Sequence, residues 1–163
     1  MKVLGIDPGT AACGYGIVQE SDGRLRALDF GWWKTHASDR PEARLRTIFE
    51  GVTALVEQVS PDAVVLEESF VGADARTALS VGQARGAVLV AAALAGVECA
   101  EYAPAHVKQA VCAHGRAEKA QVQRMVQAIL RLDAPPAPDH AADALAVAIC
   151  HAMSPPLLKA VSA

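Results

Sequence analysis

The pattern of apolar residues at the start of the chain predicts three short strands. Apolar runs cover residues 2–6, 15–19 and 25–33, and two short turns separate them, the second being Ser21-Asp22-Gly23. Turns this short suit antiparallel neighbours, because a parallel connection needs a crossover of about a dozen residues or more. The chain therefore begins as an antiparallel meander.

The pattern then changes to alternating helices and strands. Between residues 41 and 59 apolar positions recur at steps of three and four, as on one face of a helix, and Pro61 ends this segment. Residues 63–66 are continuously apolar, which is typical of a parallel strand buried on both faces. Residues 76–95 follow as a helix that is apolar nearly all round. We expect the sheet to bury one side of that helix, and either its own domain or a partner subunit to bury another.

The rest of the chain predicts one more strand and three more helices. These segments are residues 97–102, 104–112, 117–132 and 139–151. There is no internal repeat, so we predict a single α/β domain over residues 1–153 and a tail at 154–163.

Composition narrows the class of protein. The 163 residues include four scattered cysteines without metal-binding spacing, Cys13, Cys99, Cys112 and Cys150, which we expect to be reduced and buried. The longest uninterrupted apolar stretch, residues 86–97, falls short of the roughly 20 residues of a membrane span. With no secretory signal at the first residues, we predict a cytoplasmic protein without a membrane segment.

Charge is unevenly distributed. The net charge of −3 is unlike that of a generic nucleic-acid binder. Between residues 103 and 131, however, the single acid Glu118 stands against five bases, Lys108, Arg116, Lys119, Arg124 and Arg131. This segment is either a solvated helix face or a phosphate-binding surface beside an acidic pocket.

Two carboxylates follow predicted strands. Asp7 comes directly after the first strand, and Pro8-Gly9 then turns the chain away, although a turn aspartate can also simply bond its own backbone. Glu67 and Glu68 follow the strand at 63–66. Neighbouring side chains on a strand point to opposite faces, so only one of these two glutamates can approach Asp7.

The last helix adds further polar groups. His140 and Asp143 stand three residues apart on one helical face, whereas Asp139 is either another member of this group or a helix N-cap. Two strand-end acids with a His/Asp pair make an oxygen-rich cluster suited to Mg²⁺ or Mn²⁺. A pair of such ions would neutralise the carboxylates and activate a water for in-line attack on phosphorus.

Six motifs, in order along nearly the whole chain, resemble those of the RuvC family of Holliday junction resolvases. They are Gly5-Ile6-Asp7-Pro8-Gly9-Thr10 with Gly14-Tyr15-Gly16, Leu66-Glu67 with Phe70, Gly82-Gln83-Ala84-Arg85-Gly86, Val107-Lys108-Gln109, Ala117-Glu118-Lys119 and Ala141-Ala142-Asp143-Ala144-Leu145-Ala146. Each block alone is weak, but six in order and at family-like spacing are specific.

The resemblance implies an RNase H-like fold, with a five-stranded mixed sheet of three antiparallel strands and then two parallel strands, flanked by helices. It implies that Asp7, Glu67 and Asp143 are metal-binding catalytic acids, with Glu67 rather than Glu68 at the family's position. It further implies that Lys108 and Lys119 are the basic residues beside the site. Phe70 would stack on a base near the crossover.

His140 departs from the family's commonest pattern, in which this position holds a fourth aspartate. An imidazole must be neutral to bind a metal ion, so we expect His140 as a ligand to make activity fall in acid. It could also shift the preference from Mg²⁺, with two ions per site, towards Mn²⁺.

The activity that the resemblance implies is resolution of four-way DNA junctions in recombination and repair. Two symmetric metal-dependent nicks would leave 5′-phosphate and 3′-hydroxyl ends. A two-fold homodimer presents two identical sites to the two like strands, and residues 76–95 are the candidate interface. The resemblance also implies cooperation with a RuvAB-type branch-migration complex.

Three other interpretations share some of these features. The loop at residues 7–10 is similar to the first phosphate loop of the actin, sugar-kinase and Hsp70 superfamily, but those phosphotransferases need two lobes and a second loop. A related nuclease acting on RNA or simpler DNA would share the acids. A catalytically silent junction-binding module would keep these acids beside phosphate at an electrostatic cost.

Overall fold

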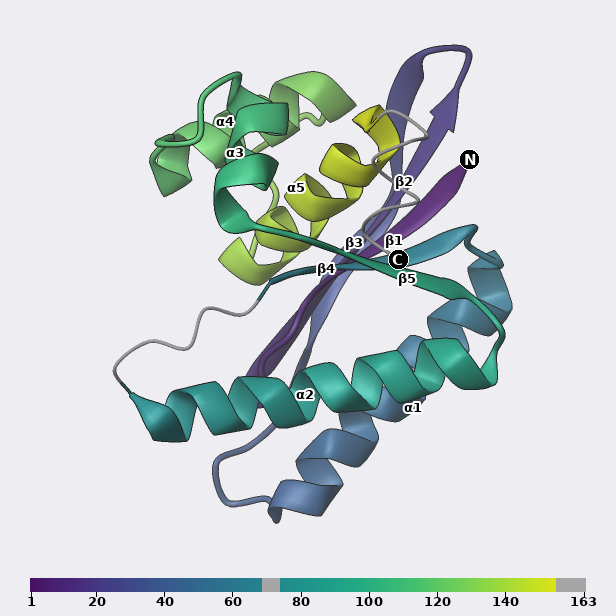
Figure 1. Ribbon diagram of the computed structural model, residues 1–163, viewed down its shortest axis with the longest axis vertical. Helices are drawn as coiled ribbons and strands as arrows, with labels where there is room; N and C mark the ends of the chain where they lie inside the picture. The colour runs from purple at the N-terminus through teal and green to yellow at the C-terminus, as the bar shows by residue number, and fades with distance from the viewer. Residues whose placement is uncertain (69–73, 155–163) are drawn as a thin grey trace.

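A mixed five-stranded sheet forms the centre of the fold (Figure 1). The computed structural model describes residues 1–68 and 74–154. Its strands, in the order β3-β2-β1-β4-β5, are β1 (Lys2–Asp7), β2 (Ala12–Ser21), β3 (Arg24–Lys34), β4 (Ala63–Glu67) and β5 (Glu98–Tyr102). The pairs β1–β2 and β2–β3 are antiparallel, whereas β1–β4 and β4–β5 are parallel. The predicted meander and mixed sheet are therefore confirmed.

Helices cover both faces of the sheet (Figure 1). One face carries α1 (Pro41–Val59) and α2 (Ala75–Leu94). The other carries α3 (Pro104–Cys112), α4 (Lys119–Leu130) and α5 (Asp139–Met153). The predicted helices are all present, with shifted ends: α4 starts two residues later than expected, at Lys119, and α5 extends to Met153.

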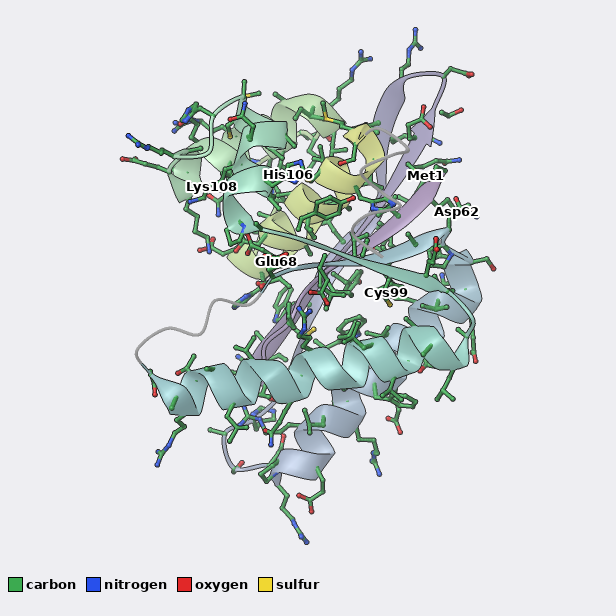
Figure 2. The ribbon with its side chains drawn as sticks, viewed as in Figure 1. Met1, Asp62, Glu68, Cys99, His106 and Lys108 are labelled. Carbon is green, nitrogen blue, oxygen red and sulfur yellow. The ribbon has the colours of Figure 1, made fainter. Side chains whose placement is uncertain are left out.

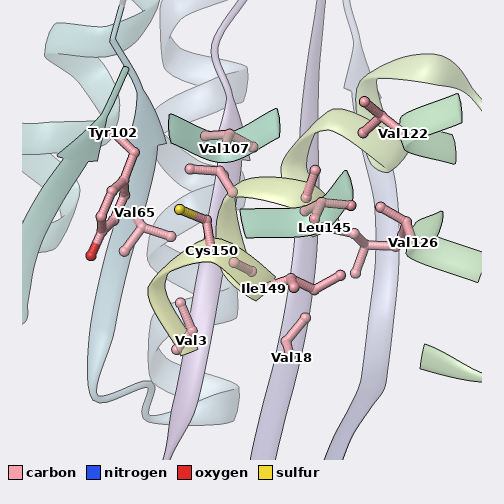
Figure 3. Packing of buried hydrophobic residues seen from close by; sticks show 14 of the residues in the cluster. Val3, Val18, Val65, Tyr102, Val107, Val122, Val126, Leu145, Ile149 and Cys150 are labelled. Atoms are coloured by element: carbon pink, nitrogen blue, oxygen red, sulfur yellow. The ribbon is translucent and has the colours of Figure 1, made fainter. Parts of the chain in front are cut away.

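Strand alternation determines which face each candidate acid reaches. In β1, Val3 packs in the core under α5, and Leu4 packs in the core under α1 and α2. In β4, Val65 and Leu66 divide between the two cores in the same way. Figure 3 shows Val3 and Val65 in the core on the α5 side. Continuing the alternation, the strand-end acids of β1 and β4 both point to the α5 side.

Glycines let α5 lie directly on the sheet. A Cβ atom on Gly5 of β1 would overlap the carbonyl oxygen of Ala144, and one on Gly14 of β2 would overlap the carbonyl oxygen of His140. At Gly16 it would lie 2.7 Å from Leu145 Cδ2. Because no side chain separates helix and strands here, the first turns of α5 are held against the ends of β1 and β2.

The cysteines are free thiols, as predicted. Cys13, Cys112 and Cys150 are buried, but Cys99 on the outer strand β5 is only partly buried, so the prediction of four buried cysteines is wrong at that position. Burial raises the pKa of Cys13 to about 12 and that of Cys150 to about 11. These two thiols are therefore protonated and unreactive at neutral pH.

Helix α2 is buried on one side only. Its buried residues are Ala84, Val88, Ala91 and Ala92, whereas Leu79 and Leu94 are 66% and 75% exposed. Enclosure of this helix within its own domain is therefore excluded in the part of the chain that the structure describes. By length and composition alone, α2 is long and apolar enough to cross a membrane. One helix with these properties is only weak evidence for a membrane span.

The contact between α5 and the sheet gives a stability prediction. Gly5→Ala places a methyl group against backbone that cannot rotate away, so it should lower the free energy of unfolding by at least about 2 kcal/mol in urea titration. Ala54→Gly is the matched control, since it changes one methyl group at an exposed position of α1 and should cost only about 1 kcal/mol of helix propensity. Equal stability of the two variants would contradict the proposed role of Gly5.

Candidate active site

Three carboxylates from separate elements meet at one edge of the sheet. Asp7 ends β1, Glu67 ends β4, and Asp143 comes from the second turn of α5. The strands β1 and β4 are parallel neighbours in which Ile6 lies opposite Leu66, so their ends coincide. Burial raises the pKa of both Asp7 and Glu67, and the charge of Asp143 raises both further, which places the three groups within electrostatic reach of one another.

Glu67 has the most strongly shifted pKa of the three carboxylates. Burial raises its pKa to about 7, with further contributions from the charges of Asp143 and Asp7, and Lys108 and Lys119 offset part of the shift. Glu68, the alternative from the sequence, is exposed. Its backbone N–H donates a hydrogen bond to the carbonyl of Tyr102 at 2.9 Å. The structure thus brings Glu67, and not Glu68, to the other acids.

Asp7 and His140 form a direct contact. The Nδ1 atom of His140 lies 2.7 Å from Oδ2 of Asp7. Burial raises the pKa of Asp7, although the hydrogen bond from His140 opposes this shift. The His140 side chain remains 46% exposed. The sequence allowed Asp7 to be either a turn residue that bonds its own backbone or a member of a group of site residues. The structure places it in a cluster of polar side chains.

Lys119 lies between two carboxylates of α5. Its Nζ atom is 3.0 Å from Asp143 Oδ2 and 3.3 Å from Asp139 Oδ2. Partial burial lowers the pKa of Lys119, but the hydrogen bonds and charges of Asp143 and Asp139 outweigh it and the net pKa is raised. Asp139 is the first residue of α5, and the N-cap is Pro138, so the alternative of Asp139 as the N-cap is wrong.

Gln123 is a member of this network that the sequence analysis missed. Its Nε2 donates to Asp139 Oδ1 at 2.8 Å, and this bond, with that of Lys119, lowers the pKa of Asp139. Lys119 and Gln123 stand four residues apart on α4, so they share one face of that helix. This four-residue spacing was the feature of the sequence that could have indicated Gln123 as a site residue. It becomes informative only once Asp139 is known to face α4.

A pocket of about 240 Å³ opens beside these groups. It is lined by Glu67, Pro104, Val107, Lys108, Lys119, Val122, Asp143 and Ala146. Figure 2 shows Lys108 on α3, on the side of the molecule where Glu68 marks the end of β4. The pocket therefore joins two predicted lysines to two predicted acids. Phe70, the predicted stacking residue, lies outside the described residues.

The donor chemistry suits a hard divalent cation. As the side chains stand, no three His, Cys, Asp or Glu groups of residues 1–68 and 74–154 are arranged around one metal position, and Asp7 and Asp143 bond His140 and Lys119 instead. The available ligands are nevertheless oxygen-rich, with one imidazole, as Mg²⁺ and Mn²⁺ prefer. A cation there would also remove the carboxylate repulsion that helps to raise the pKa of Glu67.

Comparison with known proteins gives consistent matches along the chain. The family model described as "Crossover junction endodeoxyribonuclease RuvC" matches residues 3–151. The protein of that name from Moorella thermoacetica is 53% identical over 156 residues, covering 96% of this chain and 93% of the relative. The Chloroflexus aurantiacus protein of the same name is 49% identical over 159 residues, covering 98% and 97%.

Solved structures agree with the sequence matches. Thermus thermophilus RuvC superposes with a TM-score of 0.85 at 41% identity, covering 93% of each chain. T. thermophilus RuvC in complex with Holliday junction substrate gives 0.86 at 39% identity, with the same coverage. The yeast mitochondrial Holliday junction resolvase, at 13% identity and a TM-score of 0.63, shares the fold alone. The fold is thus RNase H-like, and the chain belongs to the RuvC family of crossover junction endodeoxyribonucleases.

Proposed function

We propose that this protein is a structure-selective endonuclease that resolves four-way DNA junctions by two symmetric, metal-dependent nicks. The observation that carries the proposal is the convergence of Asp7, Glu67 and Asp143 beside Lys119, in a chain of this nuclease family. The relative solved with a Holliday junction supports the choice of substrate. The products would be ends with a 5′-phosphate and a 3′-hydroxyl.

The proposed metal ligands are Asp7, Glu67, His140 and Asp143. Two Mg²⁺ ions per site, or Mn²⁺ in their place, would activate a water for attack on phosphorus and stabilise the leaving 3′ oxygen. His140 already contacts Asp7 through Nδ1, which leaves Nε2 as the other nitrogen available to a ligand.

The lysines would prepare the site for the phosphate. Lys119 pairs with Oδ2 of Asp143, so a cation at that carboxylate would compete with the ammonium group for its charge. Asp139, whose other oxygen accepts a hydrogen bond from Gln123, is a second partner that would keep Lys119 beside the site. Lys108 lines the same pocket. Both ammonium groups would thus face the scissile phosphate and offset its charge.

The exposed face of α2 is the proposed dimer interface. Leu79, Val90 and Leu94 are exposed, and Gly82 and Gly86 between them have open space where a Cβ would lie. Their spacing places them on one side of the helix. Exposed apolar surface of this kind marks an interaction site, and a second copy related by a two-fold axis would cover it. The same axis would present two active sites to two like strands.

Two wider expectations follow from the family resemblance alone. We infer that the protein acts in the cytoplasm, where bacterial DNA recombination and repair take place. We also infer a RuvAB-type branch-migration complex as a partner, without assigning residues to that contact.

The function is tested by cleavage of a synthetic mobile four-way junction and a matched linear duplex. We expect paired symmetric nicks in the junction only, with Mg²⁺ or Mn²⁺ and not with EDTA. Asp7→Asn should reduce the rate by at least about 100-fold, because a metal ligand is lost. His140→Asp should flatten the loss of activity in acid and reduce any preference for Mn²⁺.

In the assay of the wild type, binding without cutting would point to a silent junction-binding module. Equal cutting of the junction and the linear duplex would point to a general nuclease.

Glu67 gives a pH prediction for the metal-free protein. Its pKa of about 7 in the fold lies above the ordinary value of 4.5, so the folded state favours the neutral carboxyl. This contribution to stability is complete below about pH 4.5 and is lost as the pH rises through 7. In EDTA, Glu67→Gln should therefore be more stable than the wild type at pH 8, with the difference shrinking towards pH 4.5 in thermal unfolding. A difference that does not vary with pH would exclude the shift.

The dimer is tested by charge on α2. Val90→Arg and Leu94→Glu should each raise the dimer dissociation constant by at least about 10-fold in sedimentation equilibrium, since each buries an unpaired charge. Leu28→Arg, an exposed apolar position on β3, is the matched control. Wild-type association of both α2 variants would place the dimer interface elsewhere.

A further inference from the structure

Trp32 is a large exposed aromatic residue that lies beside the candidate site. It is 46% exposed and sits on β3 directly opposite Gly14 of β2. Residues directly opposite in an antiparallel pair project from the same face. A Cβ on Gly14 would meet His140, so Trp32 projects from the face, and at the level, on which His140 stands.

The alternation along β3 shows where the cover of α5 ends. Phe30 lies opposite Gly16, where α5 covers the sheet at Leu145, and it packs against the core. Trp32 is two residues further on, at the level of the first turn of α5. Lys34, two residues beyond, is exposed and makes no ion pair with any residue that the structure describes. The same face thus passes from core to open surface at Trp32.

The neighbouring tryptophan has a different environment. Trp33 projects to the opposite face, where its ring lies 4.9 Å from that of Tyr15 and against Gly51 of α1. Trp33 is therefore accounted for by packing, whereas nearly half of Trp32 remains in water. Trp32 is also on β3 and not on the exposed face of α2, so the proposed dimer interface does not account for it.

We propose that Trp32 is a stacking surface for a nucleobase of the DNA strand held in the active site, with Lys34 at a neighbouring phosphate. The proposal rests on the proposed function. Sheet order places β3 on one side of β1, which carries Asp7, and β4 with Glu67 on the other. The lysines of α3 and α4 line the pocket next to Glu67. Trp32 and Lys34 would therefore contact the strand on the opposite side of Asp7 from Lys108 and Lys119.

Stacking of a base on an aromatic side chain predicts a measurable loss on truncation. Trp32→Ala should raise the Kd for a four-way junction by about 5- to 100-fold, and Trp32→Phe should restore most of the affinity, because a base can still stack on phenylalanine. Neither change should alter the slope of log Kd against log salt. Lys34→Ala should reduce that slope by about one phosphate contact.

Fluorescence provides a direct reading of the contact. In a Trp33→Phe background Trp32 is the single tryptophan, and Asp7→Asn permits binding without cleavage. We expect the emission of Trp32 to be quenched as a synthetic four-way junction is added. Leu28→Ala, which also removes a large apolar side chain that is 42% exposed on the same strand, is the control and should keep wild-type affinity for the junction.

The outcomes separate the two proposals. If the wild type binds and cuts the junction but Trp32→Ala binds with unchanged Kd and Trp32 is not quenched, the stacking surface is refuted and the proposed function stands. If emission changes on dilution of the protein without DNA, Trp32 belongs to a contact between copies, which also overturns the proposal. If the wild type does not bind a junction at all, the proposed function itself fails.

Discussion

The contact of α5 with β1 and β2 is the constraint on which the site depends. Asp143 can approach Asp7 and Glu67 only if the helix lies directly on the strands, and Gly5, Gly14 and Gly16 remove the side chains that would hold it away. Side chains alternate between the two faces along β1 and β4, and the residues that pack under α5 share a face with Asp7 and Glu67. Both strands therefore present their last residues to α5. Packing and chemistry therefore share one surface of the sheet, and a change in either disturbs the other.

Neighbouring cations and protons offset the charge of the clustered acids. Lys119 bonds Asp143, His140 bonds Asp7, and burial with carboxylate repulsion brings the pKa of Glu67 to about 7. Each of these arrangements reduces the cost of concentrating acids at the edge of a buried sheet. Asp139 and Gln123 would keep Lys119 beside the phosphate if a cation competed for Asp143. The charges that stabilise this cluster of acids are the ones that would contact the substrate.

Much of this arrangement could be predicted from the sequence, and the limits have physical causes. Apolar periodicity predicted the strands and helices, and the acids at the ends of β1 and β4 indicated the edge of the sheet where the candidate site residues lie. The roles of Asp139 and Gln123 depend on how α4 faces α5, which no local pattern encodes. The place of Trp32 beside His140 depends on the register of β2 and β3, and a register shift at Ile17/Val18 hides that register from simple counting. The three glycines on β1 and β2 become meaningful only when the helix that crosses them is known.

The convergence of α5 and two strand ends on one metal site can be tested by anomalous diffraction from crystals of the protein soaked in Mn²⁺. Manganese peaks bounded by Asp7, Glu67 and Asp143 are expected, with Lys119 still paired with Asp139. Manganese bound only elsewhere at saturating Mn²⁺ would refute a metal site built from these elements.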